Sequence, residues 1–224
     1  MKSICLIPAR GGSKRIHKKN IKPFAGKPLI GWSIECALNS GMFSDVYVST
    51  DDLEIKKISE SFGALVPFIR PKEISDDYAK DSDVRKHFIN WLEDNNIKAE
   101  ILCYLYATAP FINKETLEGC KNLLIKLNCS CVFTITEYDF SPARALIEDI
   151  SGRLSFKWNE YKNSRSQDLP KLYHDAGQCY FYNLQKKDHD LNRYGYKISR
   201  LLTQDIDTEE DFKFAEYIFK SINN

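Results

Sequence analysis

The alternation of short apolar segments with amphipathic ones is the feature that most restricts the fold of this chain. Between residues 3 and 136, apolar segments of strand length recur and are separated by segments whose apolar residues have helical spacing. The expected strands are 3–8, 45–50, 64–68, 101–106 and 130–136, and the expected helices are 28–40, 51–62, 82–95 and 114–127. This rhythm is typical of α/β proteins. We therefore predict a mostly parallel, twisted, Rossmann-like sheet with helices on both faces.

The regular alternation stops after residue 136. Residues 139–173 are polar and irregular. The remaining expected elements are strands at 153–158 and 178–182 and a closing helix at 208–222 with Thr208 at its N-cap. A chain of 224 residues is compatible with one large domain. We predict a single domain over residues 1–224, in which 139–173 is an insertion that acts as a lid or contacts a second subunit.

The composition argues against several classes of protein. Lys and Arg number 32 and Asp and Glu number 31, so the net charge of +1 gives no whole-chain support for binding nucleic acid or an anionic membrane. The apolar runs are far shorter than the ~20 residues of a membrane-spanning helix. The N-terminal apolar segment is also too short for a signal peptide. We expect a cytoplasmic protein with no nucleic-acid or membrane partner.

The seven cysteines are consistent with that location. Their number is odd, most lie in apolar patterns, and no CxxC pair is present. Cys129 and Cys131 come nearest to a metal motif, but no His or Cys partner flanks them. Buried, reduced thiols are therefore favoured over a metal site.

The strongest candidate for a binding site is the loop from Ala9 to Asn20, directly after the first strand. Open α/β sheets bind ligands where their strands end. Gly11 and Gly12 allow the backbone to approach an anion, and the nearby basic side chains would supply positive charge. These basic residues are Arg10, Lys14, Arg15, Lys18 and Lys19. The Walker A and GxGxxG patterns are absent, so we interpret the loop as a phosphate site of another kind; a solvated basic loop is the alternative.

A second candidate is the pair Asp205 and Asp207. Carboxylates two residues apart in an extended chain point to the same side. Such a pair can bind Mg²⁺, which commonly bridges protein carboxylates and substrate phosphates. The alternative is that Asp207 only caps the helix that follows, and spacing alone does not decide between the two.

A third candidate is the unusually polar sequence at 163–169 and 173–178. It could bind a polyhydroxylated ligand or form a solvated loop, and the residues themselves leave both possibilities open. His174 is a possible base, although a lone histidine is more often structural. Weaker candidates are Arg70 after a strand, Asp81 and Ser82 at a helix start, and Tyr106–Pro110, which closes a strand.

Together these segments resemble the cytidylyltransferases that activate acidic keto-sugars, and the resemblance covers nearly the whole chain. Residues 7–15 (Ile-Pro-Ala-Arg-Gly-Gly-Ser-Lys-Arg), with Lys19 and Asn20, are similar to the family's CTP-binding signature, and residues 205–208 (Asp-Ile-Asp-Thr) to its metal signature. Residues 21–24 and 106–111, and above all 165–169 with 174–178, resemble the pseudaminic acid branch. The sialic acid branch usually carries Gln-Pro-Thr-Ser-Pro at 106–110 and an Arg-Pro-Asn-Gly-Ala type segment at 174–178, and this chain departs from both.

The resemblance implies a nucleotidyltransferase that moves CMP from CTP to the anomeric hydroxyl of an acidic nine-carbon sugar, pseudaminic acid before others, and releases pyrophosphate. It implies a homodimer and Mg²⁺ held by Asp205 and Asp207, with Arg10, Lys14 and Asp207 as catalytic residues. The implied nucleotide-binding residues are Arg10, Gly11, Gly12, Ser13, Lys14, Asn20, Arg70, Ser82, Ala107 and Thr108. The implied sugar-binding residues are Tyr106, Arg165, Gln167, Asp168, His174, Asp175 and Gln178.

Two alternatives stay open. The same fold could act on N-acetylneuraminic acid, legionaminic acid or 3-deoxy-manno-octulosonate. A non-catalytic nucleotide-binding protein is the alternative from another class, and the retained Asp205 and Asp207 pair argues against it.

Overall fold

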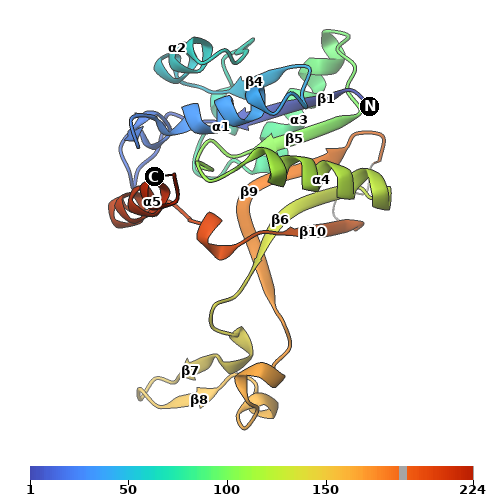
Figure 1. Cartoon of the computed structure of the whole chain (residues 1–224). Coiled ribbons are helices and arrows are strands. Elements are labelled where there is room, and N and C mark those ends of the chain that lie inside the picture. Colours follow the sequence, from blue (N-terminus) through green and yellow to red (C-terminus); the bar gives the residue numbers. More distant parts are fainter. Residues whose placement is uncertain (187–190, 224) are drawn as a thin grey trace.

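A six-stranded sheet forms the centre of the computed structural model, which describes residues 1–186 and 191–223 (Figure 1). The strands lie in the order β10-β6-β9-β5-β1-β4. Their bounds are β1 Ser3–Pro8, β4 Val46–Ser49, β5 Ile101–Leu105, β6 Cys131–Glu137, β9 Tyr173–Asn183 and β10 Arg193–Lys197. Strand β1 is parallel to β4 and β5, and β10 is parallel to β6. Only β9 runs antiparallel, between β5 and β6, so the prediction of a mostly parallel sheet is confirmed.

Helices cover both faces of this sheet. Those of the described chain are α1 (Leu29–Asn39), α2 (Leu53–Ser61), α3 (Asp81–Asp94), α4 (Lys114–Leu127) and α5 (Glu209–Asn223). Alternation along β1 sends Cys5 and Ile7 into one apolar cluster with α1 and α4, and Ile4 and Leu6 into another with α3. The strand reads as a continuous apolar run because both of its faces are buried, as is typical of parallel sheets.

The expected strand at 64–68 does not form as an element. Only isolated bridges occur here, from Leu65 to Tyr47 and from Ile69 to Thr50. Pro67 lies between them and has no N–H group to donate, so a continuous ladder cannot form. The sequence also gave no signal for β10, whose polar Arg-Tyr-Gly-Tyr-Lys sequence is that of a half-exposed edge strand.

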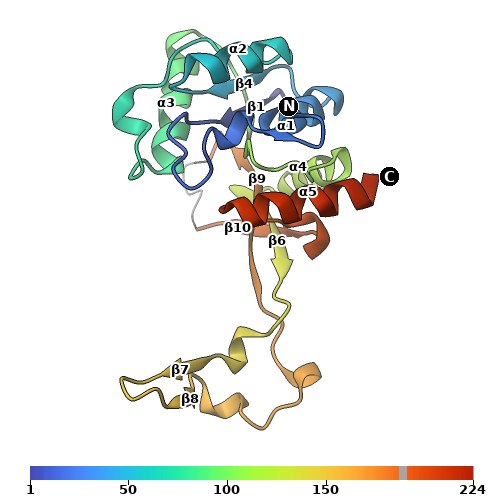
Figure 2. The same cartoon turned by 90° about the vertical axis from the view of Figure 1, so that its left-hand side faces the viewer.

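Residues 138–172 form an arm that extends away from the sheet between β6 and β9 (Figures 1 and 2). Its only sheet structure is an antiparallel pair of β7 (Leu146–Glu148) and β8 (Leu154–Phe156), and β8 lies within the strand expected at 153–158. The arm leaves apolar side chains in solvent, among them Phe140, which is 91% exposed, and the fully exposed Ile150. The predicted insertion at 139–173 is this arm.

Helix α5 brings the end of the chain back to its beginning. Phe24 lies in a short hairpin of β2 (Pro23–Phe24) and β3 (Lys27–Pro28), and its ring is 5.4 Å from those of Phe212 and Phe219 on α5. The same apolar cluster contains Ile16 of the basic loop and Ile206. Within the described residues, no helix is both long and apolar enough to cross a membrane.

Candidate active site

A cleft of about 500 Å³ opens where β1 and β5 end. Seven residues predicted to bind the nucleotide or the sugar line it, from three separate parts of the chain. They are Arg10, Ser13, Lys14, Asn20, Arg70, Tyr106 and Thr108. The cleft therefore forms at the carboxyl ends of the strands, where α/β sheets bind ligands.

The basic loop is fixed by its own residues. Ile16 is 1% exposed and packs in the cluster beneath the loop. Asn20 is 6% exposed, and its side-chain amide donates a hydrogen bond to the carbonyl oxygen of Arg10 over 2.9 Å. Asn20 thus holds the loop's backbone in place, a role that its position in a polar loop did not reveal.

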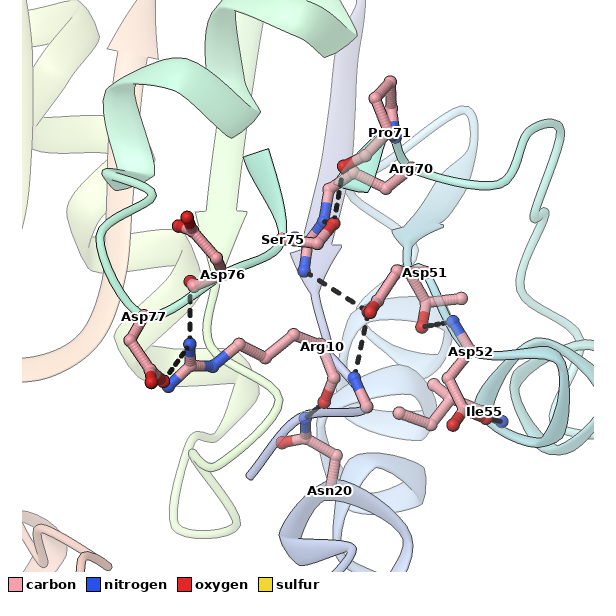
Figure 3. Close-up of polar contacts among 12 residues, drawn as sticks. Arg10, Asn20, Asp51, Asp52, Ile55, Arg70, Pro71, Ser75, Asp76 and Asp77 are labelled. Carbon is pink, nitrogen blue, oxygen red and sulfur yellow. Dashed lines mark hydrogen bonds and ion pairs between the residues drawn. The ribbon is translucent and has the colours of Figure 1, made fainter. Parts of the chain in front are cut away.

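Asp51 joins the loop to Arg70 (Figure 3). The Gly11 N–H donates to Asp51 Oδ1 over 2.9 Å, and Arg70 Nη2 lies 3.8 Å from the same oxygen. Arg70 is only 4% exposed, and its Nε donates to Ser75 Oγ over 3.0 Å. Burial lowers the pKa of Arg70, and the Asp51 charge opposes that shift. Arg70, a buried cation beside Asp51, can contribute positive charge to the cleft that it lines.

Gly11 has a steric reason to be glycine. A Cβ atom there would lie 2.7 Å from Asp52 Oδ2. The side chain of Asp52 caps α2 by accepting hydrogen bonds from the Glu54 and Ile55 amides over 2.8 and 3.0 Å. The amide of Gly11 is directed to Asp51, whereas no neighbour lies within 4 Å of a Cβ built on Gly12. An anion-binding role for Gly11 and Gly12 remains a prediction.

Arg10 and Lys14 share a carboxylate across the cleft. Arg10 Nη1 lies 2.9 Å from Asp77 Oδ1 and donates to the Asp76 carbonyl oxygen over 2.8 Å (Figure 3). Lys14 Nζ pairs with the other oxygen of Asp77. The hydrogen bond from Lys14 is the main reason that the pKa of Asp77 is lowered, with Arg10 contributing less. The two cations predicted to bind the triphosphate therefore face the same point.

Asp205 and Asp207 flank a buried residue. Ile206 is 1% exposed, while Asp207 Oδ2 lies 2.8 Å from Arg15 Nη1 and Asp207 Oδ1 lies 3.4 Å from Lys19 Nζ. Lys19 also donates to the Ile206 carbonyl oxygen over 2.6 Å. Although Asp205 as a residue is exposed, partial desolvation of its carboxyl group and the nearby Asp207 charge raise its pKa. The two carboxylates are thus close enough to repel each other.

The side chain of Asp207 faces the basic loop, and other residues bond at the start of α5. Thr208 Oγ1 accepts a hydrogen bond from the Asp211 amide over 3.1 Å, and Asp211 Oδ2 accepts one from the Thr208 amide over 2.8 Å. These bonds form the N-cap expected at Thr208. The alternative in which Asp207 only caps the helix is therefore not what the structure shows.

Asp81 and Tyr106 line the cleft and belong to a group of hydrogen-bonded tyrosines and carboxylates. Tyr104 donates to Asp81 over 2.9 Å, and Tyr106 donates to the other Asp81 oxygen. The Tyr106 ring is 5.6 Å from that of Tyr180, which donates to Asp175 Oδ2 over 2.7 Å. Sequence reasoning missed Tyr104 and Tyr180, because tyrosines within strands read as structural. Asp81, a weaker candidate at a helix start, accepts the hydrogen bonds of Tyr104 and Tyr106.

The other residues predicted to bind the sugar are spread out. Gln178 is 4% exposed and donates to the Leu202 carbonyl oxygen. The His174 ring packs 4.7 Å from that of Tyr138 at the base of the arm. Arg165, Gln167 and Asp168 lie on the arm, where Arg165 Nε and Asp168 Oδ2 are 2.8 Å apart. A single chain does not bring these three residues to the cleft (Figure 2).

Comparisons with known proteins identify the family of this chain. A family profile described as Cytidylyltransferase matches residues 4–216. This chain belongs to the cytidylyltransferase family. It is 41% identical to the pseudaminic acid cytidylyltransferase of Campylobacter jejuni, over 98% of this chain and 97% of that protein. It is 32% identical to an N-acylneuraminate cytidylyltransferase of Streptococcus agalactiae, over 95% of this chain and 52% of that protein.

A solved structure supports the fold. This chain is similar in fold to a solved structure of CMP:2-keto-3-deoxy-manno-octonic acid synthetase complexed with CTP, with a TM-score of 0.70 and 16% sequence identity. The match covers 99% of this chain and 100% of that one. The predicted α/β class of the family is therefore confirmed.

We expect Asp51 to stabilise the loop and the buried Arg70 together. Asp51→Ala removes the acceptor of the Gly11 amide and the carboxylate beside Arg70, so the free energy of unfolding should fall by about 1–3 kcal/mol. Asp51→Asn retains an oxygen that can accept from the Gly11 amide, so its free energy of unfolding should fall by less. Urea denaturation measures both variants. Equal stability of Asp51→Ala and the unaltered protein would contradict this role.

Proposed function

We propose that this chain transfers CMP from CTP to the anomeric hydroxyl of pseudaminic acid and releases pyrophosphate. The observation that carries the reaction is the convergence of Arg10 and Lys14 with the segment of Asp205 and Asp207 around one basic loop. The 41% identity to the Campylobacter jejuni enzyme over nearly the full length of both chains supports the choice of sugar.

The reaction brings two anions together. The anomeric oxygen attacks the α-phosphorus, the bond from that phosphorus to the bridging oxygen of the β-phosphate breaks, and the hydroxyl proton is lost. Negative charge increases on the departing pyrophosphate. Arg10 and Lys14 reach the same point in the cleft, so together they would orient the triphosphate and stabilise that charge. The buried Arg70 would add positive charge without contacting solvent.

The residues at 205–207 fit a bound Mg²⁺. Asp205 and Asp207 offer the oxygen ligands that this ion prefers. Partial burial and, after it, the nearby Asp207 charge raise the pKa of Asp205, and a bound cation would offset that repulsion. The described residues contain no group of three His, Cys, Asp or Glu side chains arranged to hold a metal. Two carboxylates with phosphate and water oxygens completing the shell is the usual way that Mg²⁺ binds. The ion would neutralise phosphate charge.

The arm fits a role in a homodimer. It exposes apolar side chains that its own chain does not cover, and it holds Arg165, Gln167 and Asp168 away from its own cleft. In a dimer, a second copy would cover these apolar groups and would also bring arm residues of one chain near the cleft of the other. A lid that folds back over its own cleft is the alternative role.

The acceptor is tested by incubating the protein with CTP, Mg²⁺ and one sugar at a time, and by measuring pyrophosphate. We expect pseudaminic acid to give the highest kcat/KM among pseudaminic, legionaminic and N-acetylneuraminic acids and 3-deoxy-manno-octulosonate. Another preferred sugar would change the acceptor assignment. CTP binding without pyrophosphate release from any sugar would indicate a non-catalytic nucleotide-binding protein.

Loss of Lys14 or Asp207 should reduce turnover sharply. Removing one preorganised charge contact typically costs ~10²–10³ in kcat, so we expect that loss for Lys14→Ala and for Asp207→Ala without unfolding. Lys18→Ala is the control for the loop, because Lys18 pairs with Glu54, and Glu210→Ala is the control for the acidic segment. Near-normal turnover in either test variant would refute the role assigned to that residue.

The dimer is tested by making the arm polar. The double variant Phe140→Ser and Ile150→Ser should sediment as one chain, whereas the unaltered protein should sediment as two. Leu53→Ser is the control, because Leu53 is 71% exposed on α2 and lies outside the arm. An unaltered protein that sediments as a single chain would favour the lid.

A further inference from the structure

Asp77 holds the position in the cleft where the charges of Arg10 and Lys14 converge. Each of its carboxylate oxygens pairs with one of these cations. Among the described residues, these are the ion-pair partners found for Asp77. The carboxylate therefore binds the same two side chains that the proposed reaction requires for the triphosphate.

The loop that carries Asp77 is built to present it. Ser75 Oγ accepts a hydrogen bond from Arg70 Nε and donates one to the Pro71 carbonyl oxygen over 2.8 Å. Asp76 Oδ1 accepts from the amides of Tyr78 and Ala79 over 2.9 and 2.8 Å, which forms a turn around Asp77. The side chain of Asp76 stabilises the turn, whereas that of Asp77 points to the cations.

A carboxylate in this position competes with phosphate for the same donors. It carries one negative charge, whereas a triphosphate carries several and can contact both cations at once. Exposed ion pairs are weak, so a polyanion can displace Asp77, but an anion of low charge gains less over the carboxylate that it replaces. The contact would also re-form when pyrophosphate leaves.

We propose that Asp77 is a specificity-determining residue of nucleotide binding, whose carboxylate occupies the triphosphate position between Arg10 and Lys14 until CTP displaces it. This inference rests on the proposed function, because it assigns the two cations to the triphosphate. It makes Asp77 a competitor of both the substrate and the pyrophosphate product.

The test is calorimetric titration of the full chain with CTP, and separately with pyrophosphate, in the presence of Mg²⁺ and without sugar. Asp77→Asn keeps the shape and removes the charge, so the Kd for each ligand should fall by about threefold to tenfold. Asp76→Asn is the matched control, because it removes a charge one residue away and its retained Oδ1 can still accept from Tyr78 and Ala79. Its Kd should change by less than about twofold.

A double variant separates direct competition from a general charge effect. In a Lys14→Ala background one of the two partners is missing, so Asp77→Asn should tighten CTP binding less than it does in the unaltered protein. An unchanged or higher Kd for Asp77→Asn would overturn the proposal. An equally large fall in Kd for Asp76→Asn would also overturn it.

The results that would refute the proposed function differ from those that would refute the competition by Asp77. If the unaltered protein binds CTP and Asp77→Asn binds it more tightly, but no sugar releases pyrophosphate, the transferase assignment fails and the competition stands. If the unaltered protein binds no CTP, both are overturned.

Discussion

The packing of Ile206 against the apolar cluster beneath the basic loop is the contact on which the site depends. Ile16 comes from the first 20 residues and Ile206 from the last 20, yet both are 1% exposed in one cluster. Lys19 strengthens the junction by donating to the Ile206 carbonyl oxygen. Because Ile206 points inward, Asp205 and Asp207 on either side of it are held at the surface beside the loop. One buried side chain thus positions two acidic ones.

The cations around the loop share their carboxylate partners. Arg10 and Lys14 share Asp77, and Arg15 and Lys19 share Asp207, so these cations outnumber their partners although the net charge of the whole chain is only +1. In the proposed reaction, a triphosphate would bring the negative charge that this excess of cations favours, and phosphate would replace Asp77 at Arg10 and Lys14. Mg²⁺ bound by Asp207 would compete with Arg15 and Lys19 for that carboxylate. In the free protein, each of these four cations therefore has a carboxylate partner.

Much of this arrangement could be predicted from the sequence, for identifiable reasons. Strand β1 is apolar on both faces, which predicted a buried parallel strand, and the glycines and cations after it predicted the cleft. Asp77 could not be predicted, because its importance comes from Arg10 and Lys14, which are distant in sequence. Asp81 was only a weaker candidate from the sequence, because its partners Tyr104 and Tyr106 are also distant. The three predicted sugar residues of the arm show the same limit: their motif is recognisable, but a single chain holds them away from the cleft. The prediction of a strand at 64–68 was wrong for a local reason, because Pro67 has no N–H group to donate to a strand ladder.

Graded truncation of Ile206, followed by calorimetry with CTP and Mg²⁺, tests most directly whether this contact builds the site. Ile206→Val removes one methylene group and Ile206→Ala leaves a larger cavity, with stability losses of about 0.5–1.5 and 2–5 kcal/mol, respectively. At a temperature where both variants remain folded, CTP affinity should fall from the unaltered protein to Ile206→Val and further to Ile206→Ala, although neither change touches a charged group. Unchanged CTP affinity in a folded Ile206→Ala variant would contradict the account.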